Sequence, residues 1–279
     1  MSLTSKAVFV VERNLDRDLS LDAVAAACGV SRFHLAHAFA AATGRTVMDY
    51  ARARRLSEAA RALLQGAPNI LNIALAAGYT SHEAFSRAFR ARFNITPEDL
   101  RKRADSGGLN LEEVYSLNTR RHVSLAAPQI KSFAQQLFVG LSASRRKGDS
   151  AQIPAQWRDF MSRPYHQIAY KENLPPVGVT LPGDAEEEFA YVCAAPVSRF
   201  GGTPVGLNEI TVAPAQYAVF AHDGHVSDLP NTYAAIWNDW FPASGRTPKR
   251  AASLEHHNPS FDPRTGEGGV TLWIPLAEE

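Results

Sequence analysis

The chain is poor in cysteine: among its 279 residues, only Cys28 and Cys193 are cysteines. Two thiols so far apart provide no disulfide framework, which favours a protein of the reducing cytoplasm. The sequence also lacks an apolar run near the ~18 residues that a membrane-spanning helix needs. Its first residues lack a basic stretch followed by an apolar segment. We therefore expect neither a membrane span nor an export signal.

Motifs of catalysis and metal binding are scarce as well. The sequence contains no glycine-rich phosphate loop and no G-x-S-x-G elbow. The pairs His222/His225 and His256/His257 invite a metal-site interpretation, but the first pair lies where we expect a turn, and no cysteine accompanies it. We therefore expect no metal site, no cofactor and no catalytic residues.

Charged residues are unevenly distributed, although the net charge is only +1. Residues 1–103 contain 15 Lys and Arg against 9 Asp and Glu, whereas residues 104–279 contain 14 against 19. A basic region followed by an acidic one is typical of a nucleic-acid-binding domain joined to a regulatory module. Chance can also produce such a difference, so charge alone does not decide the function.

A glycine-centred turn that leads into a helix occurs twice near the start of the chain, over 27–39 and 77–89. A short helix, a tight turn and a second helix with an apolar back form the helix-turn-helix signature. Residues 48–64 predict a long arginine-rich helix between the two copies. Two copies joined in this way indicate sequence-specific DNA binding. At an offset of 50, the matching positions are Ser31/Ser81, Leu35/Phe85, Phe39/Phe89 and Thr46/Thr96.

Residues 5–103 resemble the DNA-binding domain of AraC-type transcription regulators. The resemblance rests on the stretch 78–101, which carries the family's diagnostic pattern through Phe85 and the Thr96-Pro97 pair. It implies two helix-turn-helix units that read successive major-groove faces of one double-stranded DNA. The reading positions that it implies are Arg32, Phe33, His37, His82, Glu83 and Arg87.

Several of these side chains suit particular base edges. Arg87 can contact guanine bidentately, Glu83 can accept from the amino group of cytosine, and Phe33 can pack on a thymine methyl group. His37 stands where the family more often has arginine, so we expect the first half-site to be read less stringently or by shape. Arg52, in the long helix, is expected to touch DNA phosphate. The alternative for each residue is a solvated helix face.

The second half of the chain contains a repeat of its own, with a period of 80 residues. Each copy is predicted to form a strand, a tryptophan-bearing helix and an apolar strand that ends at a proline. We therefore predict a multidomain α and α+β protein. Its N-terminal domain is all-α with two helix-turn-helix units, and its C-terminal domain is α+β with a pseudo-twofold strand-helix-strand repeat. Matching positions are Gln136/Gln216, Val139/Val219, Trp157/Trp237 and Asp159/Asp239.

Residues 119–277 resemble the GyrI-like effector-binding fold, most clearly over 200–277. The matching stretches are 214–224, 237–242, 253–255 and 272–275. The resemblance implies a domain that senses small molecules, often lipophilic cations. A few members of that family are hydrolases, so an enzymatic second domain is an alternative that the resemblance leaves open.

Glu255 is the acidic residue that the GyrI-like resemblance assigns to the ligand site. A carboxylate on the wall of an aromatic cavity is costly unless it is paired, which favours a cationic ligand. Tyr191, Trp237 and Trp273 could supply aromatic faces to that cation. The alternatives are a surface carboxylate and ordinary core aromatics.

The domain organisation expected from the sequence is a DNA-binding domain over 1–105, a linker over 106–118 and an effector-binding domain over 119–279. We expect a cytoplasmic transcription regulator whose DNA affinity or contact with RNA polymerase responds to a small-molecule effector. One alternative is a small-molecule hydrolase of the GyrI-like fold with a DNA-binding head. Another is a regulator whose second domain mediates only protein contacts.

Overall fold

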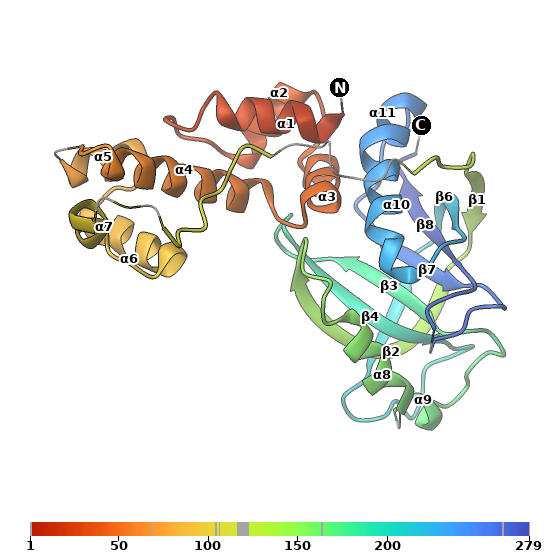
Figure 1. Ribbon diagram of the computed structural model, residues 1–279. Coiled ribbons are helices and arrows are strands. Elements are labelled where there is room, and N and C mark those ends of the chain that lie inside the picture. The colour runs from red at the N-terminus through yellow and green to blue at the C-terminus, as the bar shows by residue number, and fades with distance from the viewer. Residues whose placement is uncertain are drawn as a thin grey trace. The chain divides into compact units, whose positions relative to one another are not determined.

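The structure is a computed structural model that describes residues 2–67, 69–103, 105, 107–115, 123–162, 164–263 and 265–278. The expected boundary between 118 and 119 lies outside these described residues, and so does residue 106, where the expected linker begins. Contacts between residues divide the chain into two compact units, 1–35 with 45–119 and 36–44 with 120–279. Helices come first in the chain and strands follow (Figure 1).

The helical region forms the expected helix-turn-helix pairs. The first pair is α2 with α3, the second pair is α5 with α6, and α4 is the long helix between them, as predicted. The helices are α1 (Leu3–Glu12), α2 (Leu21–Cys28), α3 (Arg32–Thr43), α4 (Val47–Leu64), α5 (Ile70–Ala76), α6 (His82–Phe93) and α7 (Pro97–Arg103).

Residues at the offset of 50 have the same local roles at the ends of these helices. The Thr46 hydroxyl accepts from the Asp49 amide at 3.1 Å, and the Thr96 hydroxyl accepts from the Asp99 amide at 3.2 Å. Such a side-chain cap satisfies an amide that the helix leaves unpaired. Ser31 and Ser81 cap α3 and α6 in the same way.

The helices that follow the turns also end alike. Gly44 after α3 has a φ of 74° and Asn94 after α6 has a φ of 56°. Both residues adopt the left-handed conformation that closes many helices and that favours glycine or asparagine. The two units that repeat at an offset of 50 therefore share the backbone conformation at the end of the second helix.

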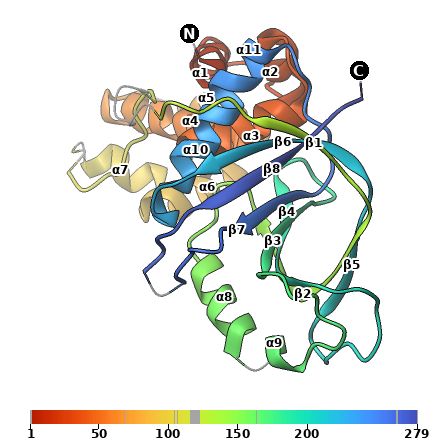
Figure 2. The same ribbon diagram turned by 90° about the vertical axis from the view of Figure 1, so that its right-hand side faces the viewer.

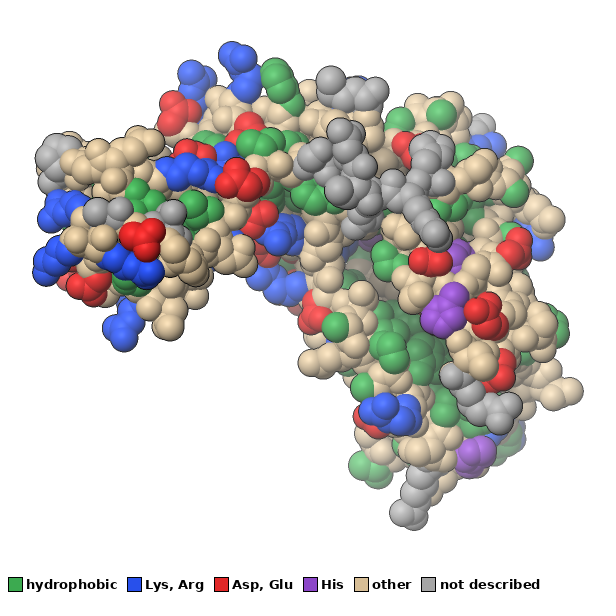
Figure 3. All heavy atoms as spheres, viewed as in Figure 1, with side chains coloured by type: hydrophobic (Ala, Val, Ile, Leu, Met, Phe, Trp, Pro, Cys, Tyr) green, Lys and Arg blue, Asp and Glu red, His purple; other side chains and the backbone are tan. Residues whose placement is uncertain are grey.

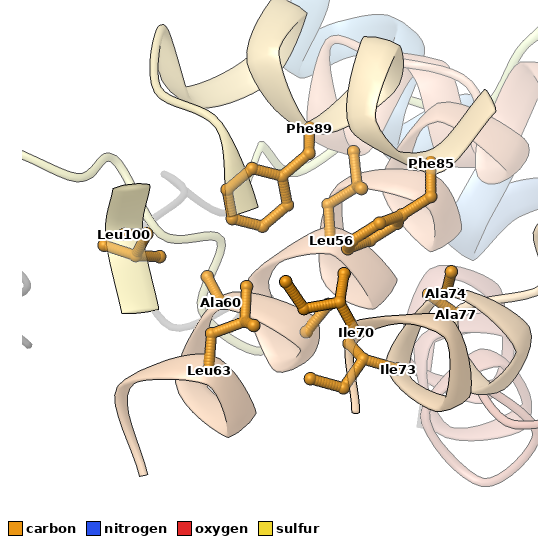
Figure 4. Close-up of a cluster of buried hydrophobic side chains, with 11 residues drawn as sticks. Leu56, Ala60, Leu63, Ile70, Ile73, Ala74, Ala77, Phe85, Phe89 and Leu100 are labelled. Carbon is orange, nitrogen blue, oxygen red and sulfur yellow. The ribbon is translucent and has the colours of Figure 1, made fainter. Parts of the chain in front are cut away.

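A compact apolar core holds the second helix-turn-helix pair together (Figure 4). Phe85 and Phe89 lie four residues apart on α6 and are fully buried against side chains of α4 and α5. Full burial of such a side chain contributes about 1.5–3 kcal/mol. The buried members of this core are Leu56, Ala59, Ala60, Leu63, Ile70, Ile73, Ala74, Ala77, Phe85, Phe89 and Leu100.

The remainder of the chain forms an eight-stranded antiparallel sheet with helices. The strands are β1 (Gln129–Phe133), β2 (Gln136–Arg146), β3 (Val177–Pro182), β4 (Glu188–Pro196), β5 (Asn208–Val212), β6 (Ala215–His222), β7 (Ser253–His257) and β8 (Val270–Leu276). The helical segments are α8 (Ile153–Ser162), α9 (Pro164–Gln167), η2 (Val226–Asp228), α10 (Leu229–Ala235), the π-helical turn η3 (Ile236–Trp240) and α11 (Phe241–Ser244).

The strand order reflects the predicted pseudo-twofold repeat. The order is β1-β6-β8-β7-β3-β4-β2-β5, so β3 and β7 meet at the centre and each half contributes its first strand to the far edge of the other half. Sequence alone did not predict this exchange of β1 and β5, because it depends on pairing between distant segments. A residue on β3 or β7 thus lies where both halves can reach it.

The two faces of the sheet carry different clusters. Alternate residues of a strand point to opposite faces. Tyr191 and Cys193 of β4 pack with Phe160 of α8, whereas Val192 packs on the other face in a cluster with Trp273. Helices α8 and α10 lie on the same side of the sheet (Figure 2). We call that side the helical face.

Candidate functional site

Helix α6 presents a polar outer face to solvent. His82, Glu83 and Arg87 are exposed, and Ser81 fixes the start of their helix by accepting from the Ala84 amide at 3.1 Å. Arg87 makes no ion pair with any residue that the structure describes, while His82 Nε2 lies 2.8 Å from Glu98 Oε1. The guanidinium of Arg87 is therefore available for an external acceptor.

Helix α3 presents its predicted reading residues differently. Phe33 and His37 are half-buried rather than exposed. The side chain of Arg32 is 52% exposed, and its Nε lies 3.2 Å from a carboxylate oxygen of Asp22. This surface ion pair is weak enough to exchange for another anion.

Three arginines on α4 have separate roles. Arg52 has a side chain that is 62% exposed and a long contact of 3.3 Å to Asp49. Arg54 is buried and paired bidentately with Glu12, with both distances 2.9 Å. Arg55 donates to the backbone carbonyls of Leu15 and Arg17, which lie between α1 and α2. Of the three, only Arg52 has a side chain that solvent largely surrounds.

The segment that follows α7 lies along α4 instead of standing apart from it. Leu109 and Leu111 pack on the apolar core, and the Glu112 amide donates to the Ser57 hydroxyl at 2.8 Å. The Glu112 carboxylate lies 2.7 Å from Arg45 and 3.2 Å from Arg92. Residues 109–115 thus connect the loop after α3 with α6. This part of the expected linker belongs with the helices by its contacts.

Basic side chains gather on the helical region in the space-filling view (Figure 3). Their positions agree with the excess of Lys and Arg in residues 1–103. A surface of this kind attracts the phosphates of nucleic acid without regard to sequence.

A second cluster of functional groups surrounds Glu255 on β7, at the centre of the sheet. Tyr191 Oη of β4 donates to Glu255 Oε2 at 2.7 Å, and Tyr233 Oη of α10 donates to Glu255 Oε1 at 2.7 Å. The strand predicted around Glu255 is confirmed. One carboxylate therefore joins the two halves of the repeat, and each of its oxygens has a phenol donor.

Gly178 makes this arrangement sterically possible. It pairs with Glu255 across β3 and β7 and with Cys193 across β3 and β4. A Cβ atom at this position would lie 2.4 Å from Tyr191 Oη and 2.9 Å from Glu255 Oε2. Only a residue without a side chain leaves room for the phenol to reach the carboxylate.

Helix α8 supports the tyrosine from the other side. Trp157 Nε1 donates to Tyr191 Oη at 3.1 Å. The Gln156 amide donates to the backbone oxygens of Leu141 and Tyr191, both at 2.8 Å. These bonds hold α8 on β2 and β4, and they fix the phenol that contacts Glu255.

Protonation of the two tyrosines is stabilised by their surroundings. Burial, together with the charge and the hydrogen bond of Glu255, raises the pKa of Tyr191 and Tyr233 well above the usual range. Both phenols therefore remain donors at neutral pH. Glu255 makes no ion pair with any basic residue in the described ranges.

Aromatic rings border the carboxylate. The ring centroids of Trp157 and His257 are 5.1 Å apart, and His257 stacks on Phe261 at 4.3 Å. Trp157, Tyr233, Glu255 and His257 are each half-buried, so solvent reaches the group. Figure 3 shows hydrophobic side chains gathered between α8 and α10. The arrangement can accept an aromatic, positively charged ligand.

The predicted aromatic residues are divided between separate places. Tyr191 contacts Glu255 directly. Trp237 lies in the π-helical turn, is buried, and stacks on Phe241 with centroids 5.0 Å apart. Trp273 of β8 packs on the opposite face of the sheet, where its ring contacts Phe133. The structure thus brings together Glu255 and Tyr191, but not Trp273.

Three residues of this cluster were missing from the sequence-based prediction. Trp157 was visible as the repeat partner of Trp237, and that match was the signal that could have suggested it. Tyr233 lies one helical turn before Trp237, but no motif marks it. Gly178 is ordinary in sequence, because its role comes from pairing with a distant strand.

The histidine pair of 222 and 225 is engaged in hydrogen bonds within the domain. His222 is held by Thr232 Oγ1 at 2.7 Å and by the His225 carbonyl at 3.1 Å. Across the described ranges, no group of three or more His, Cys, Asp or Glu residues could hold a metal ion. None of the helices in the described part of the chain is long and apolar enough to cross a membrane.

Comparison with known protein families identifies two domains in the chain. Residues 24–103 match the model of a helix-turn-helix domain, and residues 126–277 match that of the GyrI-like small molecule binding domain. The second match alone covers more than half of the chain. This chain belongs to the AraC-type regulators with a GyrI-like domain. It is a DNA-binding transcription regulator with a small-molecule-binding domain.

Individual relatives agree with this assignment. The chain is 27% identical to the transcriptional regulator Rob of Salmonella typhimurium over 288 residues, which cover 94% of this chain and 92% of Rob. It is 40% identical to the regulatory protein SoxS of Escherichia coli over 93 residues, which cover 33% of this chain and 87% of SoxS. Rob, which matches most of this chain, is a transcription regulator of a non-enzymatic family, and this similarity favours the regulator over the hydrolase alternative.

A solved structure is similar to part of this regulator. It is SAV2435 bound to tetraphenylphosphonium, with a TM-score of 0.43 and 18% sequence identity. The match covers 55% of this chain and 94% of that chain.

Proposed function

We propose that this regulator responds to a lipophilic cation that binds on the helical face of the sheet, with Glu255 as the counter-charge. The observation that carries the proposal is a carboxylate among half-buried aromatic rings that forms no ion pair with the described basic residues. The phenols of Tyr191 and Tyr233 stabilise its charge without neutralising it. A cation can offset the remaining cost of desolvation, whereas a neutral ligand of the same shape cannot.

The aromatic part of the proposed site differs from the sequence-based expectation. Tyr191, Tyr233 and Trp157 are the rings that we propose to contact the ligand, because they are hydrogen-bonded around Glu255. Trp237, which was expected there, remains a proposal of lower rank, since its ring stacks on Phe241 and other side chains donate the two hydrogen bonds to Glu255. Trp273 lies on the other face of the sheet, so its side chain does not contact Glu255.

Titration calorimetry with a charged and a neutral probe tests this proposal. Glu255→Gln keeps the shape and removes the charge, so it should weaken tetraphenylphosphonium by about tenfold or more, since each 1.4 kcal/mol is tenfold. Binding of triphenylphosphine oxide, which is uncharged, should change much less. Glu172→Gln, at an exposed position, is the matched control and should leave both affinities unchanged. Equal losses for both probes would remove the counter-charge role, and absence of binding to the unaltered protein would favour a domain that mediates protein contacts.

The DNA-reading residues form the second part of the proposal. We propose that Arg32, Phe33, His37, His82, Glu83 and Arg87 face base edges and that Arg52 faces phosphate. Arg87→Ala should cost about 1–3 kcal/mol at a cognate site and relax one base position. Arg52→Ala should instead weaken binding to all sequences alike and lower the salt dependence. Binding to a randomised DNA library, measured at several salt concentrations, separates the two, and an unchanged sequence preference for Arg87→Ala would contradict the assignment.

A domain division of 1–105, 106–118 and 119–279 remains part of the proposal, and a fragment tests it. A fragment of residues 1–105 should bind DNA as a monomer, because one chain already contains both helix-turn-helix units. Residues 109–115 pack on α4, so a fragment that ends at residue 115 should be the more stable of the two. DNA binding that requires a dimer would count against this organisation.

RNA polymerase is the further partner that we propose, because a regulator bound at a promoter acts through the polymerase. The corresponding location is the cytoplasm, where chromosomal DNA is accessible. Transcription in vitro with purified polymerase, with and without tetraphenylphosphonium, measures whether the ligand changes promoter output.

A further inference from the structure

Arg145 is a buried cation that none of the roles described above requires. It lies on β2, where Leu141 pairs with Cys193 and Ala143 pairs with Tyr191 of β4. Because strand residues alternate between faces, Arg145 is on the helical face with Tyr191 and Cys193. It is 9% exposed.

The guanidinium of Arg145 is poorly satisfied by the protein. Its single hydrogen bond in the described residues runs from Nη2 to Gln156 Oε1, at 2.7 Å. Its Nε is buried and has no hydrogen-bond partner. Arginine stays charged in proteins and carries five N–H donors, so most of its hydrogen-bonding capacity is unused. No described carboxylate forms an ion pair with it.

The acidic residues at the start of β4 are paired with other cations. Glu187 lies 3.0 Å from Arg146, and Glu186 lies 3.6 Å from Arg250. A buried charge without an opposite charge destabilises the folded protein. Its presence therefore indicates a role other than stability. An anionic group from outside the chain is the partner that would offset this cost.

Consecutive residues of α8 connect Arg145 with Glu255. Gln156 accepts from Arg145, and Trp157 donates to the Tyr191 hydroxyl that in turn donates to Glu255. The thiol of Cys193 is influenced by both charges: burial and then Glu255 raise its pKa, whereas Arg145 lowers it. The helical face therefore holds a negative and a positive group that both act on the thiol of Cys193.

We propose that Arg145 is an anion subsite of the effector site and that the natural effector is a zwitterionic amphiphile. Its cationic end binds at Glu255, and its acidic end, a carboxylate, binds at Arg145. This inference rests on the proposed effector site at Glu255. A ligand with only a positive charge leaves Arg145 unpaired and is repelled by it, whereas a zwitterion satisfies both groups.

Two triphenylphosphonium compounds test the subsite in the full chain. One carries a carboxybutyl chain and the other a pentyl chain, so they differ in a single acidic group. Titration calorimetry at neutral pH should show that the unaltered protein prefers the carboxylated compound by about tenfold. Arg145→Met removes the charge at similar length and should abolish the preference, while the pentyl compound binds as well as before or better. Arg145→Lys keeps the charge and should retain part of the preference.

Each outcome distinguishes the subsite from the effector site itself. Equal binding of both compounds by the unaltered protein, or a preference that survives Arg145→Met, overturns the subsite and leaves the site at Glu255 intact. If Arg145 only anchors α8 through Gln156, the substitution changes both affinities by the same factor. Glu255→Gln should weaken both compounds alike. Failure of both compounds to bind the unaltered protein overturns the effector site and this inference together.

Discussion

Residues 50 positions apart in the helical region have the same structural role, whereas residues 80 positions apart in the strand-rich region do not. Thr46 and Thr96 each cap a helix by accepting from the amide three residues later. Trp157 donates to Tyr191 beside Glu255, but its repeat partner Trp237 is buried against Phe241. The first repeat preserves two copies of one unit. The second preserves an architecture in which the halves contribute different residues to a single site.

The difference follows from what each region recognises. If the two helix-turn-helix units read two stretches of the same DNA, as the proposed function requires, each must keep the turn and caps that orient its second helix. A pseudo-twofold domain that binds one cationic ligand, as we propose, needs only one carboxylate. Glu255 comes from the second half, and Tyr191 comes from the first. Symmetry therefore survives in the sheet and is lost in the cluster around Glu255.

Acid should destabilise the strand-rich region most, through His256 on β7. Burial, and then His257, lower its pKa from 6.5 to about 4. The folded protein therefore binds this proton less readily than the unfolded chain does, and stability falls as the pH drops from about 6.5 towards 4. The expected loss between about pH 7 and about pH 4.5 is on the order of 2–3 kcal/mol. His256→Leu should remove this part of the pH dependence.

Tryptophan fluorescence makes that measurement specific to one region, since all four tryptophans follow residue 119. Urea unfolding of the full chain at the two pH values gives the free energy of unfolding for the region that contains them. His256→Gln is a second variant that does not titrate and should behave as the leucine variant does. An equal pH dependence in all three proteins would rule out His256 as its source.

Substitutions at two glycines test two different causes of instability, which are steric overlap at Gly178 and backbone strain at Gly29. Gly178→Ala introduces a methyl group 2.4 Å from Tyr191 Oη, and such overpacking typically costs about 1–3 kcal/mol. Gly29 has open space around it but a φ of 72°, so Gly29→Ala should cost about 1–2 kcal/mol through strain alone. Tyr191→Phe removes Oη, the nearest of the atoms that the new methyl group would meet at Gly178.

A double-mutant cycle tests that distinction. In the Tyr191→Phe background, Gly178→Ala should cost clearly less than in the original protein, while the cost of Gly29→Ala should be unchanged. Thermal unfolding of the original protein, the three single variants and the two double variants gives both coupling energies. Additive costs at residues 178 and 191 would mean that the phenol does not limit the space at Gly178.

Local features of the fold could be predicted from the sequence, and pairings between distant segments could not. Ser81 and Gly78 fix their turn through neighbouring backbone, so the second helix-turn-helix pair was predictable. The strand that carries Glu255 was predictable for the same reason. Tyr233 was not, because its contact with Glu255 depends on how α10 packs on the sheet.

Strand periodicity explains why Trp273 was assigned to the ligand. An apolar strand identifies buried residues, but the face to which each one points depends on the register of pairing. Leu254 pairs with Trp273 and shares its face, so the next residue, Glu255, points to the other side. Glu255 lies one position after Leu254, the residue that pairs with Trp273. This shift of one position places the tryptophan and the carboxylate on opposite faces of the sheet.

The two tryptophans at the offset of 80 should differ in their effect on ligand binding. Trp157→Phe removes the hydrogen bond to Tyr191 and should weaken tetraphenylphosphonium by about five- to tenfold, as expected for the loss of a bond worth about 1 kcal/mol. Trp237→Phe should lower stability through lost packing and leave the affinity nearly unchanged. Calorimetric titration of both variants measures the difference, and similar losses of affinity would show that the two halves contribute alike.

The smallest expected effect concerns the helix caps. Loss of the Thr46 cap and loss of the Thr96 cap should lower the free energy of unfolding by the same amount. Thr46→Ala and Thr96→Ala each remove an accepted bond from the amide three residues later, at 3.1 and 3.2 Å. Loss of such a cap typically costs about 1 kcal/mol. Thr46 is 3% exposed, so its methyl group also packs, and replacement by serine separates this packing from the cap. Thr46→Ser and Thr96→Ser should retain most of the stability, as measured by circular dichroism during urea unfolding. If only one threonine contributes to stability, the two units share their sequence pattern at an offset of 50 but do not share the energetic role of the cap.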